Sequence, residues 1–235
     1  MNVKQYLDIQ WVRYMAYIVG TILVLVIIYQ IMKRFTGVNI VSSVPVKKES
    51  YTICTHDNDI YAANVNSITK YSKLGKKLAS IHIKNVNCIK NVNSDIVVLS
   101  SNVMHWFDPN LNHIDSLETP PIDGLSWFAW HMEKWWLCSV GNETIIYCFN
   151  PEWDMIGYWK LPHKLKHCQL HGGDWGGNTL FVNDSKDMYE LYLPDTKVHA
   201  ALVRKIPVCF KGGSFSITGK YVWGISKDTA VKCKI

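Results

Sequence analysis

The longest uninterrupted apolar run in the chain lies near its N-terminus. Residues Tyr14–Met32 carry no formal charge, and Gln30 is the only strongly polar side chain among them. As a helix this run would be about 28 Å long, close to the ~30 Å hydrocarbon core of a bilayer. It therefore predicts one transmembrane helix at 14–32, after a short tail at 1–13. A cleaved signal peptide and a buried core helix are the alternatives, but the former usually has a shorter apolar region and the latter a polar face.

Aromatic and basic side chains flank this run, as they do at the two interfaces of a bilayer. They are Trp11, Tyr14, Tyr17 and Tyr29, with Arg13, Lys33 and Arg34. Further lysines, Lys47 and Lys48, follow on the C-terminal side. The positive-inside rule therefore predicts that the rest of the chain lies on the cytoplasmic or equivalent side, although the sequence does not say of which membrane.

After Phe35 the pattern changes to short alternating runs rich in Val, Ile, Tyr, Trp and Phe, separated by polar and glycine turns. Such runs are typical of half-buried strands. Equivalent apolar positions recur at intervals of 36, 39, 45 and 42 residues, namely Ile60, Ile96, Trp135, Leu180 and Val222. A repeat of about 40 residues that contains only strands and turns is typical of a propeller blade. The 200 residues from 36 to 235 would hold about five blades.

The two ends of the repeat region predict how the ring closes. The last unit is short, and the segment 38–46 has an orphan strand pattern before the first unit. We therefore expect a linker and ring-closing strand at 33–48, followed by a β-propeller domain at 49–235, because closure protects the sheet edges. A β-sandwich is the alternative, since it also has a strand every 8–12 residues. The predicted fold class is thus an all-β propeller of about five blades preceded by one transmembrane helix.

Charge and cysteine content exclude several classes of protein. The net charge is +6, but part of this excess flanks the apolar segment, so it does not indicate a nucleic-acid-binding face. The seven cysteines include no C-x-x-C, and the nearest pair is Cys138 and Cys148. This excludes a small disulfide scaffold and an ordinary zinc module. Unpaired thiols also favour a reducing compartment, in agreement with the charge bias.

The last third of the chain carries several motifs that recur in known propellers. They are H-G-G-D-W-G-G at 171–177, Y-E-L-Y-L-P at 189–194, I-P-V at 206–208 and G-K-Y-V-W-G-I-S at 219–226. This stretch resembles the C-terminal part of the NHL-like or cycloisomerase-like propellers of exported bacterial proteins of unknown function. The resemblance implies the propeller fold more than any activity, because the motifs are mostly structural.

Three histidines are the candidate metal ligands. His56, His131 and His171 each precede an apolar strand of the repeat, and Asp174 follows the third. Equivalent positions of different blades can face the central channel, where imidazoles could bind a metal. The alternative is that each histidine bonds a neighbouring loop. Because no H-E-x-x-H or close ligand spacing occurs, we expect no metal and no cofactor.

Glycine and tryptophan are concentrated in the second half of the chain. The segment Gly172–Gly177 lacks the Lys-Ser/Thr ending of a phosphate-binding loop and precedes a strand, so we expect a tight connection between blades. Tryptophans could stack on sugars, anchor a partner protein or pack between blades, and packing is expected for most of them. The candidate interaction residues are Trp127, Trp130, Trp135, Trp136, Trp153 and Trp159.

Two functional hypotheses remain. The chain contains no G-x-S-x-G and no local Cys–His signature of a nucleophile. The sequence does not decide whether the protein is an enzyme, but it favours a non-enzymatic, membrane-anchored scaffold or accessory subunit whose partners are other membrane-protein subunits. The alternative is an extracytoplasmic ligand-binding or hydrolase/isomerase-type propeller with a site at the channel mouth. Fold alone does not choose between them.

Overall fold

We describe the protein from a computed structural model, in which residues 18–19, 21–22, 40–141, 143–165, 168–184, 186–195, 198–208, 210 and 213–235 are described. Of the predicted transmembrane helix at 14–32, only four residues fall in these ranges, and they are helical. That prediction therefore lies outside the described residues. Within the described part of the chain, no helix combines the length and apolar character needed to cross a bilayer.

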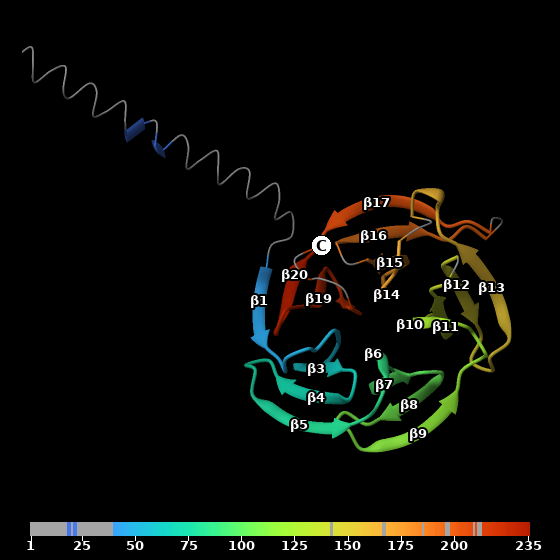
Figure 1. Cartoon of the computed structure of the whole chain (residues 1–235), viewed down its shortest axis with the longest axis horizontal. Helices are drawn as coiled ribbons and strands as arrows, with labels where there is room; N and C mark the ends of the chain where they lie inside the picture. The colour runs from blue at the N-terminus through green and yellow to red at the C-terminus, as the bar shows by residue number, and fades with distance from the viewer. Residues whose placement is uncertain are drawn as a thin grey trace, which may run out of the picture. The chain divides into compact units, whose positions relative to one another are not determined.

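The described residues form five antiparallel sheets of four strands each, arranged around a common centre (Figure 1). Blades 1 to 4 contain β2–β5, β6–β9, β10–β13 and β14–β17, and blade 5 contains β18, β19, β20 and β1. In chain order, the strands are β1 Ile40–Pro45, β2 Thr52–His56, β3 Asp59–Asn64, β4 Ser67–Ser72, β5 Lys77–His82, β6 Val86–Val92, β7 Asp95–Ser100, β8 Val103–Phe107, β9 His113–Glu118, β10 Leu125–His131, β11 Lys134–Ser139, β12 Ile145–Phe149, β13 Met155–Lys160, β14 Gly172–Gly176, β15 Thr179–Asn183, β16 Asp187–Tyr192, β17 Ala201–Pro207, β18 Ser216–Thr218, β19 Tyr221–Ser226 and β20 Thr229–Lys234. The prediction of a five-bladed propeller is confirmed, and the β-sandwich alternative is wrong.

Strand β1 closes the ring. It pairs antiparallel with β20, with Val44 opposite Ala230 and Pro45 opposite Thr229. Val44 is 3% exposed and packs in one apolar cluster with Ile53 and Ile60 of blade 1 and Ile225 and Ala230 of blade 5. The N-terminal strand thus completes the last sheet, as the segment 38–46 predicted, and covers the edge that β20 would otherwise expose.

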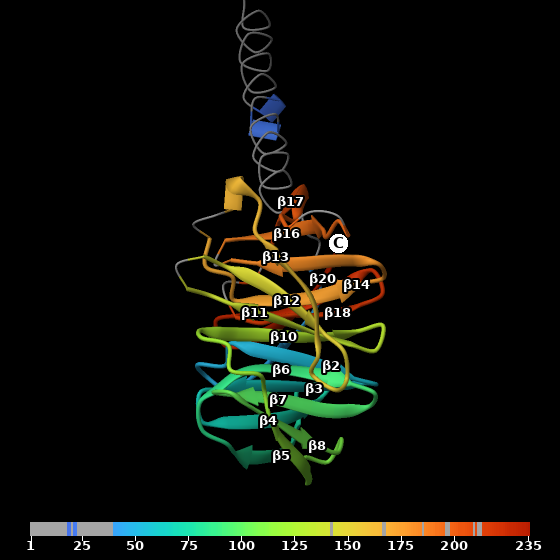
Figure 2. The same ribbon diagram turned by 90° about the vertical axis from the view of Figure 1, so that its right-hand side faces the viewer.

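The core lies in the second strand of each blade and between neighbouring blades. The five recurring apolar positions of the sequence fall in β3, β7, β11, β15 and β19, and all are buried: Ile60, Ile96, Trp135, Leu180 and Val222. Outer strands are more exposed, as in β9, where every residue faces solvent. Figure 2 shows the propeller edge-on, with the outer strand β13 of blade 3 toward the viewer. This gradient is typical of blades that pack face to face.

The glycine-rich segment at 172–177 differs from the prediction. Residues Gly172–Gly176 form the innermost strand β14, and only the following Gly177, at φ +62°, occupies a turn with positive φ. In the strand the glycines permit close approach: a Cβ on Gly172 would lie 2.6 Å from the Cα of Ser214 in the next blade. The sequence predicted a connection here because glycines are unfavourable in strands. In the structure they allow the close contacts that β14 makes with the neighbouring blades.

Candidate functional site

The innermost strands β2, β6, β10, β14 and β18 all end on the same side of the ring. Their C-terminal residues surround a cavity of about 310 Å³ at the centre, and all five strands contribute to its lining. The lining side chains include Thr55, His56, Lys90, Asn91, Trp130, Asp174, Trp175, Ser216 and Thr218. We call this cavity the channel mouth. Of these residues, His56, Trp130 and Asp174 were candidates from the sequence; the others were not, because the repeat pattern in the sequence comes from the second strand of each blade and not from the innermost one.

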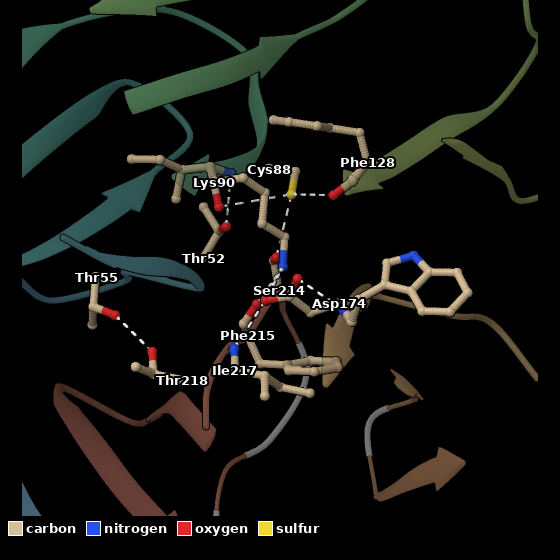
Figure 3. Close-up of polar contacts among 12 residues, drawn as sticks. Thr52, Thr55, Cys88, Lys90, Phe128, Asp174, Ser214, Phe215, Ile217 and Thr218 are labelled. Carbon is tan, nitrogen blue, oxygen red and sulfur yellow. Dashed lines mark hydrogen bonds and ion pairs between the residues drawn. The ribbon is translucent and has the colours of Figure 1, made fainter. Parts of the chain in front are cut away.

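A buried ion pair forms the floor of the channel mouth (Figure 3). The ammonium of Lys90, whose side chain is 4% exposed, lies 3.2 Å from Asp174 Oδ2 and donates to the carbonyl oxygen of Phe215. The same Oδ2 accepts the backbone N–H of Ile217 at 2.9 Å, and Oδ1 accepts that of Trp175 at 3.0 Å. Blades 2, 4 and 5 are thus tied together across the centre. Removing Asp174 would leave the Lys90 charge buried and uncompensated, and removing Lys90 would leave a partly buried carboxylate without its partner.

Further hydrogen bonds join the blades around this pair. The hydroxyl of Thr52 in blade 1 accepts the backbone N–H of Ile89 in blade 2 at 3.1 Å. The thiol of Cys88 lies 3.2 Å from the hydroxyl of Ser214 and donates to the carbonyl oxygen of Phe128 (Figure 3). Burial raises the pKa of the Cys88 thiol, which favours its protonated form over the nucleophilic thiolate. These contacts hold the innermost strands in fixed positions.

At the rim, His56 contacts its neighbours in blades 1 and 2. Its Nδ1 lies 2.7 Å from Asn91 Nδ2, and its Nε2 lies 3.4 Å from Asp57 Oδ2. Because an amide nitrogen only donates, this geometry places a lone pair on Nδ1 and the proton on Nε2. Beside it, the hydroxyls of Thr55 and Thr218 lie 3.3 Å apart and join blades 1 and 5.

The predicted histidine ligands do not occupy equivalent places. His56 and His131 end β2 and β10, at the channel mouth, whereas His171 precedes β14 and so lies at the opposite end of an innermost strand. The His131 ring stacks on that of Trp175 at 4.5 Å and 10°. Burial lowers the pKa of His131, and the nearby Asp174 opposes this effect. Among the described residues, no three His, Cys, Asp or Glu side chains form a group suited to a metal ion.

The six candidate tryptophans are all at least partly buried. Trp127, Trp135 and Trp136 are 0–8% exposed, and Trp130, Trp153 and Trp159 are partly buried against the same apolar cluster. Trp135 stacks on Trp153 at 5.4 Å and meets Trp130 at 4.4 Å. They form an aromatic network in and beside blade 3, and its parts that reach solvent border two cavities.

The second cavity is a groove of about 610 Å³ between blades 3 and 4. Five aromatic side chains line it, together with aliphatic ones and the polar Lys134, Asn178 and Asp195; the aromatic residues are Trp136, Tyr158, Trp159, Trp175 and Tyr192. We call it the aromatic groove. Its two sides are joined by Trp159 Nε1, which donates to the carbonyl oxygen of Pro194 at 2.9 Å, and by a backbone bond from Lys160 N to Val198 O at 2.7 Å. Trp175 borders both the groove and the channel mouth.

The described cysteines differ in redox state. Cys54, Cys88, Cys138, Cys148 and Cys168 are free thiols, whereas Cys233 is disulfide-bonded. Unpaired thiols were part of the argument for a reducing compartment. That argument therefore applies to five of the described cysteines and not to Cys233.

The sequence matches no protein-family model and no curated protein. Among solved structures, the glutaminyl cyclase of Myxococcus xanthus is similar, with a TM-score of 0.65 over 84% of this chain and 95% of that one, at 7% identity. The virginiamycin B lyase of Staphylococcus aureus has a TM-score of 0.47 over 79% and 66% of the two chains, at 15% identity. BamB of Moraxella catarrhalis has a TM-score of 0.42 over 82% and 61%, at 12% identity. The chain has the β-propeller fold of such proteins.

Proposed function

We propose that the protein is a non-enzymatic interaction module, tethered to a membrane, that binds a segment of a partner membrane protein in the aromatic groove. The observation that carries this proposal is the groove itself. It is the larger of the two cavities described above, and aromatic side chains from two blades line it. Aromatic anchors that fill such clefts contribute most of the binding energy in many protein interfaces.

The surroundings of the groove support the docking of a protein rather than of a small molecule. Ile156 and Tyr158 on β13 are 51% and 41% exposed, and Tyr192 at the end of β16 is 60% exposed. Met155 and Val198 add further exposed apolar surface at the same place. Together they extend the apolar lining beyond the cavity, as expected for an interface whose apolar centre is surrounded by a polar rim.

The channel mouth offers little support for turnover. Both oxygens of the Asp174 carboxylate accept hydrogen bonds, and the Lys90 ammonium is bonded to that carboxylate and to a carbonyl oxygen. A general acid or base must exchange a proton with a substrate, which these groups would do only by breaking ties between blades. We therefore favour binding over catalysis. The likeness to glutaminyl cyclase, at 7% identity, concerns the fold and does not argue for the enzyme alternative.

The predicted membrane tether explains how a groove with low intrinsic affinity could still hold its partner. A transmembrane segment at 14–32 would confine the propeller to the same surface as its partner. Confinement raises the effective concentration, so a groove of this size would hold a partner that it binds weakly from solution. The partners that we propose are therefore other subunits of a membrane complex, on the cytoplasmic or equivalent side, and not nucleic acid.

The proposal is tested in two steps. Carbonate washing of membranes should leave the full chain in the pellet, and its release would contradict the tether. Co-purification in mild detergent, followed by quantitative binding, should then show that Tyr192→Ser and Ile156→Ser each weaken binding to the identified subunit about tenfold or more, equivalent to about 1.4 kcal/mol. Leu74→Ser is the matched control, because Leu74 is 86% exposed in the turn between β4 and β5 of blade 1. Equal binding by all three variants would contradict the proposal that the partner binds in the aromatic groove.

A further inference from the structure

The polar side chains that line the channel mouth play no part in the proposed binding of a partner in the aromatic groove. The charges of the buried Lys90 and the partly buried Asp174 neutralise each other, since the two residues form an ion pair at the floor of the channel mouth. The remaining polar side chains around it are the exposed Asp57 at the rim and the uncharged Thr55, Asn91, Ser216 and Thr218, together with His56. Hydroxyl, amide and neutral imidazole groups both donate and accept hydrogen bonds. The cavity therefore presents many paired donor and acceptor groups and no uncompensated buried charge.

Aromatic rings form part of its wall and are held in place from behind. Trp130 meets Trp135 at 4.4 Å, and Trp175 is stacked on His131 and meets Trp136 at 4.7 Å. Neither tryptophan needs to reorient when a ligand arrives, so little conformational entropy is lost. The indole nitrogen of Trp175 is buried and has no hydrogen-bond partner among the described residues. The exposed lining is mainly polar, and the parts of the two rings that face the cavity add a smaller apolar surface.

We propose that the channel mouth binds a neutral saccharide of one or two rings. A sugar ring has an apolar C–H face that packs on an indole and a perimeter of hydroxyls that both donate and accept. The volume of about 310 Å³ lies at the lower end of the range for small-molecule sites, which suits a ligand of this size.

The charged side chains of the channel mouth disfavour saccharides that carry an acidic or an amino group. An anionic group at the floor would lie near Asp174, and one at the rim would lie near Asp57, whose side chain is 83% exposed. An ammonium group at the floor would instead lie near Lys90. Either ion would disturb a pair that is already compensated, whereas a hydroxyl would not. This inference rests on the channel mouth alone and does not require the aromatic groove to bind a protein.

The test uses the full chain in a phosphocholine detergent, because glucoside and maltoside detergents would themselves compete. The probes are glucose, N-acetylglucosamine, maltose, cellobiose and diacetylchitobiose, with glucuronate and glucosamine as charged counterparts, and binding is measured by saturation-transfer NMR and calorimetry. We expect at least one neutral probe to bind with millimolar or better affinity, and the charged counterparts to bind at least tenfold more weakly.

Matched variants locate the site. Trp130→Phe should weaken binding of the neutral probe at least threefold, and Thr218→Val, at an exposed position that leaves the core intact, should also weaken it. Tyr192→Ser in the aromatic groove should leave saccharide binding unchanged, which separates this result from any failure of the proposed partner interaction. The inference is overturned if no neutral probe binds at tens of millimolar, if a charged counterpart binds more tightly, or if binding is the same in the Trp130 and Thr218 variants as in the unmodified protein.

Discussion

Gly173 of β14 lies against the indole ring of Trp127 in β10, so closely that a Cβ on Gly173 would stand 2.3 Å from Trp127 Cη2. Trp127 is fully buried. The contact joins blades 3 and 4 beneath the channel mouth. It also explains why a glycine occupies a strand interior, where it is normally unfavourable.

This contact predicts the effect of adding one methyl group. Gly173→Ala should lower the free energy of unfolding by about 1–3 kcal/mol, because the indole is surrounded by other side chains and has no space to move into. Chemical denaturation of the purified protein measures the change. Gly141→Ala is the control, because a Cβ there meets nothing within 4 Å, and its effect should stay below about 0.5 kcal/mol. Similar losses in the two variants would contradict the packing argument.

The ion pair at the floor of the channel mouth predicts that replacing Lys90 lowers the free energy of unfolding far more than replacing an exposed lysine. Lys90→Met should lower the free energy of unfolding by about 2–4 kcal/mol, because the partly buried Asp174 carboxylate is left without its partner. Lys205→Met removes an ion pair with Asp187 in which the lysine side chain is 59% exposed, and it should cost less than about 1 kcal/mol. If the two substitutions cost the same, the tie across the centre does not stabilise the ring.

Ring closure predicts a contrast within β1. Val44→Ala should lower the free energy of unfolding by about 2 kcal/mol, because it removes two buried methyl groups and leaves a cavity between blades 1 and 5. Val41→Ala in the same strand should be nearly neutral, since Val41 is 51% exposed. Thermal or denaturant unfolding of both variants measures the difference. Equal stability would show that β1 does not hold the ring closed.

Acidification should destabilise the protein through His131. Its pKa in the folded state lies below the ordinary 6.5, chiefly because of burial, so the unfolded chain binds the proton more readily. The stability that His131 contributes is therefore present above about pH 6.5 and lost as the pH falls through the folded-state pKa. Denaturant midpoints at about pH 7.5 and pH 5.5 should fall less in His131→Tyr than in the unmodified protein. An equal fall in both would exclude His131 as the cause.

The fold was predictable from the sequence because every blade has a buried apolar residue at the same position of its second strand. Ile60, Ile96 and Leu180 lie on the second strand of their blades, and each packs in an apolar cluster shared with the preceding blade of the ring, so their spacing repeats with the blade. The closing strand was also predictable, because an orphan strand pattern and an incomplete last unit complement each other.

The channel mouth was predictable only in part. Lys90 lies in a strand that carries no repeat signal, and its partners Asp174 and Phe215 come from two other blades, so only the folded ring brings them together. Trp175 follows a Gly-Gly-Asp sequence typical of a loop, although it belongs to β14. Contacts between blades, rather than local propensity, determine these residues, and a single sequence does not show such contacts.

The pairing of β1 with β20 also sets an order of events during synthesis. β1 precedes every other strand of the propeller in the chain, and its partner follows all of them. As the polypeptide leaves the ribosome, blades 1 to 4 can form their sheets one after another from neighbouring segments, but β1 waits without a partner until β20 has emerged. Such distant pairing slows folding, because the entropy of closing the longest loop is lost before the contact forms. Until translation has passed β20, the nascent chain is an open arc whose first blade, where it should meet the fifth, is available to chaperones.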